Sequence, residues 1–443
     1  MKMKRFLAIL SAAALCLSIF AACGGSSPAA GESAPAAPAQ DSGAAAAPAD
    51  TPAAAEGAIR LLNGKIEIDG ALKGFAEGYQ ERTGQEVVIE SLGGGMDIFA
   101  QIMSYNAAGN MPDIFKTVPE GIFAELELDL TGQPWLDYTD MALVRDGKVV
   151  GAPYAIEGIG LIYNAEILEK AGIDPDTLTN VAAQRAAFEK LDGMKEELGL
   201  QAVISAAAES GNMGWATGLH LMSSYLAMGV DRSDKRIINL LNAGELDTER
   251  FSKFADYIEI LFSYADQNVL LSGNYDDQVG LYAQGKTAFL CQGNWVDPSL
   301  EAHGVTFRSG LLPYAFLDND TPGMTADPPD FWAVHNGGSN IDAALAFLAD
   351  ILIGEEGQRM FVQDAGAISV FSNCPYIPEM PISAELFVKS QNYPTYAWDW
   401  LLFQEALALD VTGKVFELFA KGDIDKQQFI DMMASEINIF MNQ

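Results

Sequence analysis

The sequence is poor in basic residues, and this shortage excludes a class of partner. Its 443 residues contain 26 Lys and Arg against 60 Asp and Glu, a formal net charge of −34. An electrostatic field of that sign repels phosphate groups, so we expect no nucleic-acid partner and no attraction to anionic lipid headgroups. The simplest interpretation of the charge is a solvated acidic surface.

Histidine is too scarce and too dispersed to build a metal centre. His220, His303 and His335 stand far apart with no partner at helical ligand spacing, so each is interpreted as an ordinary surface or core side chain. The glycine-rich turn at 91–95 is not followed by the Lys-Ser or Lys-Thr of a phosphate-binding loop. With no nucleophile motif in addition, we predict neither a metal, nor a cofactor, nor a catalytic residue.

The first 57 residues contain no candidate for a folded core. Residues 1–22 combine a basic start with an apolar stretch that is short for a membrane-spanning helix, which is the pattern of a secretion signal. Residues 23–57 consist almost wholly of Ala, Pro, Gly and Ser and lack Leu, Ile, Val and Phe. Such a segment cannot bury enough apolar surface to offset its ordering entropy, so we predict a disordered tether.

The junction of these two segments resembles the cleavage site of bacterial lipoproteins, because Ala21 and Ala22 directly precede Cys23. The resemblance implies that Cys23 becomes the lipidated first residue of the mature chain. The protein would then lie on the extracytoplasmic face of the cell membrane and contact the membrane through Cys23 only.

Cysteine usage fits the same compartment. Cys16 leaves with the signal and Cys23 takes the lipid, so Cys291 and Cys374 form the one possible disulfide pair. Cys291 lies in an apolar run, where a free buried thiol is common. We favour free thiols, although a bridge stays open.

From residue 58 onward, strand and helix patterns alternate. Apolar runs such as 87–89 and 111–115 are separated by segments with three-and-four spacing of apolar residues. This alternation predicts an α/β fold with largely parallel sheets covered by helices, and ligands in the crevice beyond the strand ends.

The stretch 152–175, APYAIEGIGLIYNAEILEKAGIDP, combines a strand with a capped helix. Its apolar run is interrupted by Glu157 and two glycines. Glycine weakens a strand unless another backbone or a ligand comes close, so an acid at this place suggests a site. Asn164 then starts a helix that Gly172 ends.

This stretch contains Pro-Tyr-x-x-Glu-x-x-x-Leu-Ile-Tyr-Asn and resembles the extracellular solute-binding proteins of carbohydrate ABC transporters, the maltose-binding-like group. Other segments support the resemblance by their order: ERTG and GNMPDIF at 81–84 and 109–115, YAQGKTAFLCQGNWV at 282–296, and AALAFLADILIGEEGQRMFVQDAG at 343–366. The resemblance covers about residues 58–443. It implies a periplasmic-binding-protein-like fold of two lobes, each a mainly parallel sheet covered by helices, with a ligand cleft between them.

The resemblance also implies three crossings between the lobes, near Tyr154, Phe331 and Asn373. The expected N-terminal lobe consists of residues 58–154 and 331–373. The expected C-terminal lobe consists of residues 155–330 and 374–443.

The resemblance and the local chemistry together nominate site residues. The acid of the crossing segment often accepts hydrogen bonds from sugar hydroxyls in that family, and residues just after the PDI strand reach the ligand. A sugar ring has an apolar face that stacks on flat aromatic rings and a rim of hydroxyls that needs carboxylates and amides. The expected ligand-binding set is Glu157, Trp215, Trp295, Glu120, Thr117, Trp332, Trp398 and Asn294. Core packing is the competing interpretation for each single tryptophan.

We therefore expect a monomeric, lipid-anchored receptor, without enzymatic activity, that binds an oligosaccharide by hinge closure and delivers it to the permease subunits of an ABC transporter. Two alternatives stay open. The same fold could hold a cationic solute such as a polyamine between Glu120 and Glu157. A surface glycosidase using two carboxylates is the other, since 60 acidic residues always provide some pair.

Overall fold

A computed structural model of the protein describes residues 57–92, 98–118, 121–329, 331–402 and 406–442. The predicted signal, almost all of the predicted tether with Cys23, and the candidate Glu120 lie outside these residues and stay predictions. Within the described part, no helix is both long and apolar enough to cross a bilayer. The same residues contain no group of His, Cys, Asp or Glu side chains placed to hold a metal ion.

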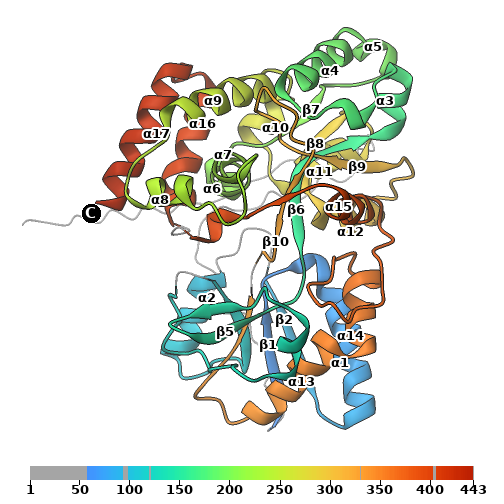
Figure 1. The fold of residues 1–443 in the computed structure, drawn as a ribbon. Helices are drawn as coiled ribbons and strands as arrows, with labels where there is room; N and C mark the ends of the chain where they lie inside the picture. The colour runs from blue at the N-terminus through green and yellow to red at the C-terminus, as the bar shows by residue number, and fades with distance from the viewer. Residues whose placement is uncertain (1–56, 93–97, 119–120, 330, 403–405, 443) are drawn as a thin grey trace, which may run out of the picture. The chain divides into compact units, whose positions relative to one another are not determined.

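The described residues form two six-stranded sheets (Figure 1). The first has the order β2-β1-β3-β11-β5-β4 and consists of β1 (Ile59–Asn63), β2 (Val87–Ser91), β3 (Ile114–Thr117), β4 (Leu143–Arg145), β5 (Lys148–Pro153) and β11 (Phe331–Val334). The second has the order β12-β10-β6-β8-β7, with β9 paired to β6, and consists of β6 (Glu157–Asn164), β7 (Ile204–Ser205), β8 (Phe289–Gly293), β9 (Ser309–Leu312), β10 (Met324–Asp327) and β12 (Thr395–Tyr396). The α/β class with two sheets is confirmed.

Both sheets are mixed, which corrects the expectation of mainly parallel sheets. In the first sheet, β1 is parallel to β2 and β3, but β11 is antiparallel to β3 and β5. In the second, β6 is antiparallel to β8, β9 and β10. The path of the chain explains why β11 is antiparallel to its neighbours. The chain returns from the second sheet along β11, whereas β5 leads from the first sheet toward the second.

The chain passes between the sheets at residues 154–156, between β10 and β11, and again between β11 and β12. The first two passages lie at and beside Tyr154 and Phe331, where crossings are expected. The lobe boundaries themselves stay a prediction. The two strands that adjoin these passages, β6 and β10, pair with each other and lie side by side in Figure 1.

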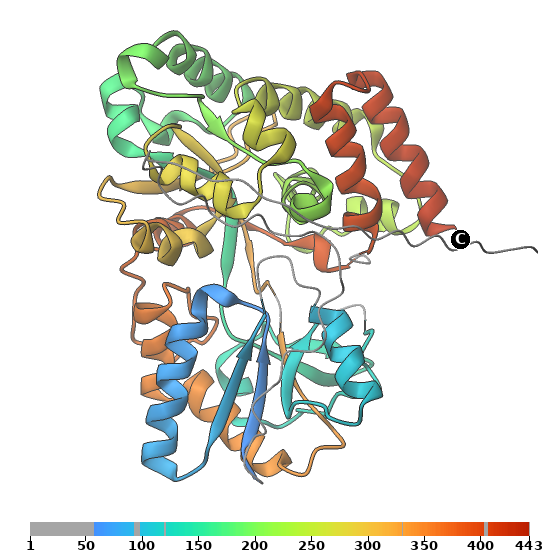
Figure 2. The same ribbon diagram turned by 180° about the vertical axis from the view of Figure 1, so that it is seen from behind.

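Helices cover both faces of the first sheet. Strand β1 shows why, because Ile59 and Leu61 belong to one core and Leu62 to another. The alternation of side chains along a strand therefore gives two apolar faces. Figures 1 and 2 show α2 on one face and α1 and α13 on the other. The helices of this part are α1 (Asp69–Thr83), α2 (Ile98–Ala107), α13 (Ile341–Ile353) and α14 (Glu355–Arg359).

The second sheet is also buried on both faces. Every residue of β6 is buried; Ile159 and Leu161 pack in one core, and Ile162 packs in another with Leu386. The accompanying helices are α3 (Ala165–Ala171), α4 (Val181–Gly193), α5 (Lys195–Leu198), α6 (Ser210–Trp215), α7 (Met222–Ala227), α8 (Arg236–Asn242), α9 (Thr248–Ser263), α10 (Gln267–Ser272), α11 (Tyr275–Ala283), α12 (Asp297–Ala302), α15 (Pro381–Asn392), α16 (Gly413–Lys421) and α17 (Lys426–Met441). Cys291, buried in β8, and Cys374 are free thiols, as favoured from the sequence.

The strand β6 and the helix after it follow the sequence closely. The side chain of Asn164 accepts the backbone N–H groups of Glu166 and Ile167, and Gly172 ends α3 with a φ of 62°. The two glycines of β6 serve packing. A Cβ on Gly160 would lie 2.0 Å from the carbonyl oxygen of Leu312 in β9, and one on Gly158 would lie 2.6 Å from the side chain of Leu386.

We expect Gly160→Ala to destabilise the protein by about 2 kcal/mol or more, because the added methyl group collides with backbone that cannot rotate away. Gly74→Ala is the matched control. Gly74 is exposed within α1 with nothing near its would-be Cβ, so the substitution should stabilise by about 0.5–1 kcal/mol. Urea unfolding of both variants measures the difference, and equal stability of the two would contradict the packing argument.

Candidate ligand-binding site

A pocket lies beside the first passage between the sheets. Its lining combines residues that follow β1, residues at the start of β6, residues that follow β8, and residues after α14: Lys65, Glu67, Ile68, Tyr154, Ala155, Glu157, Asn294, Trp295, Phe361, Ala365, Gly366 and Ala367. Three of the nominated residues, Glu157, Asn294 and Trp295, are among them. The cavity volume is about 20 Å³, which is room for about one water molecule.

Glu157 faces this pocket and forms an ion pair across it. Glu157 is 7% exposed, and its two carboxylate oxygens lie 2.6 and 2.7 Å from Nζ of Lys65. Lys65 follows β1 of the first sheet, whereas Glu157 begins β6 of the second. The ammonium also lies 5.9 Å from the ring centroid of Trp295, within the range of a cation–π contact.

Asn294 lines the pocket, and both polar atoms of its side-chain amide form hydrogen bonds within the protein. Its Oδ1 accepts the backbone N–H of Gly158 at 2.8 Å, and its Nδ2 donates to Oγ of Ser383 at 3.0 Å. One turn later, the Asp297 carboxylate accepts the backbone N–H of Ser383 at 2.8 Å. Asn294 therefore fixes the strand of Glu157 to the start of α15 and gives the pocket its shape.

Three tryptophans that are distant in sequence gather round His220. The centroid of the His220 ring lies 4.8 Å from Trp295, 5.1 Å from Trp215 and 5.6 Å from Trp398. Trp295 and Trp398 stack on each other at 6.2 Å with an interplanar angle of 18°. Nε1 of Trp295 donates to Oε1 of Gln292 at 3.1 Å, so the polar edge of this indole is satisfied within the protein. We call Trp215, His220, Trp295 and Trp398 the aromatic cluster.

His220 owes its place to a π-helix. Residues Ala216–Leu221 form η4, a π-helical segment between α6 and α7. A π-helix has i→i+5 hydrogen bonds and a wider turn than an α-helix, so positions 215 and 220 lie nearer to one face than they would in an α-helix. In the sequence His220 looks isolated, because no residue pattern there indicates that the helix changes from α-helical to π-helical geometry. The preceding helix α6 is capped by the Glu209 side chain and ends at Trp215.

Close packing supports the π-helix. A Cβ on Gly218 would lie 2.4 Å from the carbonyl oxygen of Ala408, which belongs to a second π-helix, η8 (Leu407–Thr412). Oγ1 of Thr412 in turn donates to the carbonyl oxygen of Gly218 at 3.3 Å. The absence of a side chain at Gly218 thus lets the two segments touch.

Two nominated residues, Trp332 and Thr117, belong neither to the pocket lining nor to the aromatic cluster. Trp332 is 1% exposed and stacks on Tyr154 in the core of the first sheet, with centroids 4.5 Å apart. Core packing, the competing interpretation, describes its place. Thr117 is fully buried, and its hydroxyl donates to the carboxylate of Glu127, which also pairs with Arg145. Trp332 packs behind the pocket, since its ring contacts Tyr154 and Phe361 of the lining. Thr117 lies opposite Phe331 in the sheet, on the other face from Trp332. Lys65 and His220, in turn, are residues that sequence reasoning missed.

Burial among the indoles, together with the nearby Lys65 ammonium, lowers the pKa of His220 to about 3. The unfolded chain protonates this imidazole below about pH 6.5, whereas the folded chain does not. Acidification from about pH 6 to pH 4 should therefore cost the parent up to about 1.4 kcal/mol of unfolding free energy per pH unit through His220. His220→Phe should lack this part of the pH dependence. Urea unfolding at stepped pH compares the two, and equal slopes would contradict a neutral His220 in the folded protein.

Two mixed sheets, chain segments that pass between them, and an aromatic and charged pocket beside the first passage are the arrangement of ligand-binding proteins of the hinged class. The chain belongs to the bacterial extracellular solute-binding proteins, whose family profile matches residues 74–387.

Individual relatives agree with this membership. The chain is 24% identical over 335 residues to a maltooligosaccharide ABC transporter solute-binding lipoprotein of Streptococcus pneumoniae strain R6, covering 72% of this chain and 74% of the relative. Among solved structures, a sugar transporter from Bacillus licheniformis in complex with stachyose superposes with a TM-score of 0.66 at 16% identity, covering 85% of this chain and 99% of that one. An ABC substrate-binding protein from Listeria monocytogenes in complex with cycloalternan gives 0.65 at 17% identity, covering 87% and 99%. At these identities the likeness to solved structures shows the fold.

Proposed function

We propose that this protein is a receptor that captures an oligosaccharide at the aromatic cluster and the Lys65–Glu157 pair and delivers it to an ABC permease. The observation that carries the proposal is the convergence of Trp215, Trp295 and Trp398 beside a buried carboxylate. Flat indole faces match the apolar faces of sugar rings, and the charged pair supplies donors and acceptors for hydroxyl groups.

The charge of the site favours a neutral ligand over a cationic one. A polyamine site needs carboxylates that attract an external ammonium. Here the ammonium of Lys65 already lies within 2.7 Å of both Glu157 oxygens, so the pair as a whole is neutral. A sugar hydroxyl can bridge such a pair because it both donates and accepts hydrogen bonds.

Capture requires a hinge motion. The cavity of about 20 Å³ admits no sugar ring, and its lining comes from residues on both sides of the passages. We infer that the parts carrying the two sheets separate to admit the ligand and close around it. Contacts made from both sides exist only in the closed form, so binding shifts the population toward closure.

The relatives favour an oligosaccharide as the ligand. The pneumococcal relative is named for maltooligosaccharides, and the two structures hold stachyose and cycloalternan. By the same relationship we propose that this chain works as a monomer with permease subunits of an ABC transporter. The lipoprotein-like junction at Cys23 supports anchoring at the extracytoplasmic face of the cell membrane.

A receptor of this kind makes and breaks no bond in its ligand. A glycosidase would need one carboxyl group that keeps its proton for the leaving group. The ammonium beside Glu157 stabilises the anion instead. Incubation of the purified protein with chromogenic glycosides tests this point directly, and hydrolysis would replace the receptor proposal with the enzymatic one.

Trp295→Ala should weaken binding about tenfold or more, because it removes the stacking surface that the aromatic cluster presents to the pocket. Titration calorimetry with maltotetraose, raffinose and stachyose measures the change. Trp135→Phe is the control, since Trp135 is fully buried in the core of the first sheet; it should lower stability and leave the dissociation constant unchanged. An unchanged constant for Trp295→Ala would remove this residue from the site.

The dissociation constant for the tightest of these sugars should not change with ionic strength, because neither partner of the complex contributes an unpaired charge to binding. Calorimetry in low and high salt, with spermidine as the charged comparison, distinguishes the ligand classes. Tight spermidine binding that weakens in salt would favour the cationic-solute alternative.

A further inference from the structure

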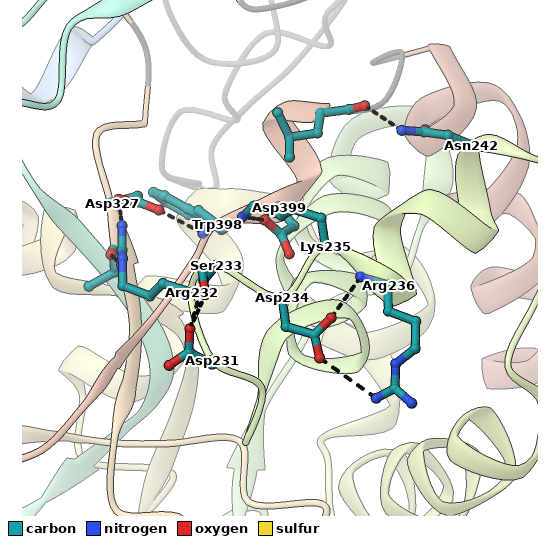
Figure 3. A network of polar contacts seen from close by, with 12 residues as sticks. Asp231, Arg232, Ser233, Asp234, Lys235, Arg236, Asn242, Asp327, Trp398 and Asp399 are labelled. Atoms are coloured by element: carbon teal, nitrogen blue, oxygen red, sulfur yellow. Dashed lines mark hydrogen bonds and ion pairs between the residues drawn. The ribbon is translucent and has the colours of Figure 1, made fainter.

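The loop between α7 and α8 holds the segment that carries Trp398 (Figure 3). Nη1 of Arg232 donates to the carbonyl oxygen of Ala326 at 3.1 Å and to Oγ1 of Thr395 at 3.3 Å. Nη2 of the same side chain donates to Oδ1 of Asp327. A single guanidinium thus joins the end of β10, which precedes a passage between the sheets, to β12.

Asp327 connects Arg232 to the aromatic cluster. Its Oδ1 pairs with Arg232, and its Oδ2 accepts the backbone N–H of Trp398 at 2.9 Å (Figure 3). The next residue, Asp399, is 4% exposed and pairs with Nζ of Lys235 at 2.6 Å. Two cations of one short loop therefore fix the backbone on which the Trp398 indole stands.

The register of the sheet shows why Asp327 needs a cation of its own. In the antiparallel pair of β10 and β6, Asp327 lies directly opposite Glu157. Side chains at such positions share one face of the sheet, and like charges there are destabilising. Lys65 compensates Glu157, and Arg232 compensates Asp327. Loss of Arg232 would leave Asp327 to compete with Glu157 for Lys65.

We propose that Arg232 is a positioning residue for the ligand site. Through Asp327 it keeps the Trp398 indole stacked on Trp295, and by neutralising Asp327 it keeps Lys65 with Glu157. Arg232 acts on the ligand only through these side chains. The effect on binding rests on the proposed function, whereas the effect on the stacked indoles does not.

The first test is spectroscopic and needs no ligand. Two stacked indoles give an exciton couplet in circular dichroism, and Trp398→Phe in the purified protein identifies the couplet of this pair. Arg232→Met keeps the length of the side chain without its donors and should reduce the couplet toward that of Trp398→Phe. Arg232→Lys, which restores the charge, should recover part of it. Arg236→Met is the matched control from the same region, since the Arg236 side chain is 70% exposed and pairs only loosely with Asp234, at 3.8 Å; it should keep the parental couplet.

The second test measures binding by calorimetry with whichever of maltotetraose, raffinose and stachyose binds the parent most tightly. Arg232→Met should raise the dissociation constant about tenfold, as expected for the loss of a charge-assisted hydrogen bond that supports a site. Arg236→Met should bind like the parent.

A parental couplet in folded Arg232→Met would overturn the proposal, and so would a parent spectrum that Trp398→Phe leaves unchanged. If Arg232→Met does not fold, Asp327→Asn takes its place, because it keeps the shape of the side chain and weakens the same bonds; an unchanged couplet there would also overturn the proposal. A parent that binds none of the sugars would refute the proposed function and leave the spectroscopic result valid.

Discussion

The ion pair of Lys65 and Glu157 is the interaction on which the site depends. It joins residues 92 positions apart, one after the first strand of the first sheet and one at the start of the central strand of the second. Burying two charges is costly unless they meet in good geometry, so such a pair contributes specificity of arrangement more than stability. Here the arrangement that it specifies is a closed pocket. The same ammonium lies near the ring of Trp295 and helps to keep His220 neutral, so the charged and aromatic parts of the site form one unit.

The aromatic cluster depends on backbone geometry as much as on its own side chains. A π-helix turns His220 toward Trp215, and the contact of Gly218 with η8 leaves no room for a side chain there. π-Helical segments are rare and occur often at functional sites. A third one, η6 (Met360–Asp364), contains Phe361 of the pocket lining. Two of these segments each supply a ring, His220 from η4 and Phe361 from η6, and η8 supplies the backbone that packs against Gly218.

The structural relatives retain this fold at 14–18% identity, which shows how little of the fold depends on particular side chains. Function resides in the side chains placed on it. In this chain we propose that these are the indoles, the neutral imidazole, and the acids Glu157 and Asp327, which lie opposite each other on the paired strands β6 and β10. The pairing of each acid with its own cation makes the passage between the sheets and the ligand site electrostatically interdependent.

The sequence by itself determined the local structure. The continuous apolar runs predict strands buried on both faces, Asn164 and Gly172 mark the two ends of α3, and the order of the segments leads to the family. Trp295 could be nominated because it follows the end of a buried strand, and Glu157 because it interrupts an apolar run beside two glycines in the segment that resembles the family. Only the tertiary structure decided which side chains contact one another. Apolar periodicity indicates that a residue is buried but not which residues it contacts, so the sequence nominates Trp332 for the site although it packs in a core. No local sequence pattern identifies Lys65 or His220. Lys65 pairs with a residue 92 positions away, and His220 is placed by a π-helix that the sequence does not predict. The first sheet is mixed because β11 enters it in the direction opposite to β3 and β5. This direction depends on the path of the chain in three dimensions and is not encoded in a local pattern.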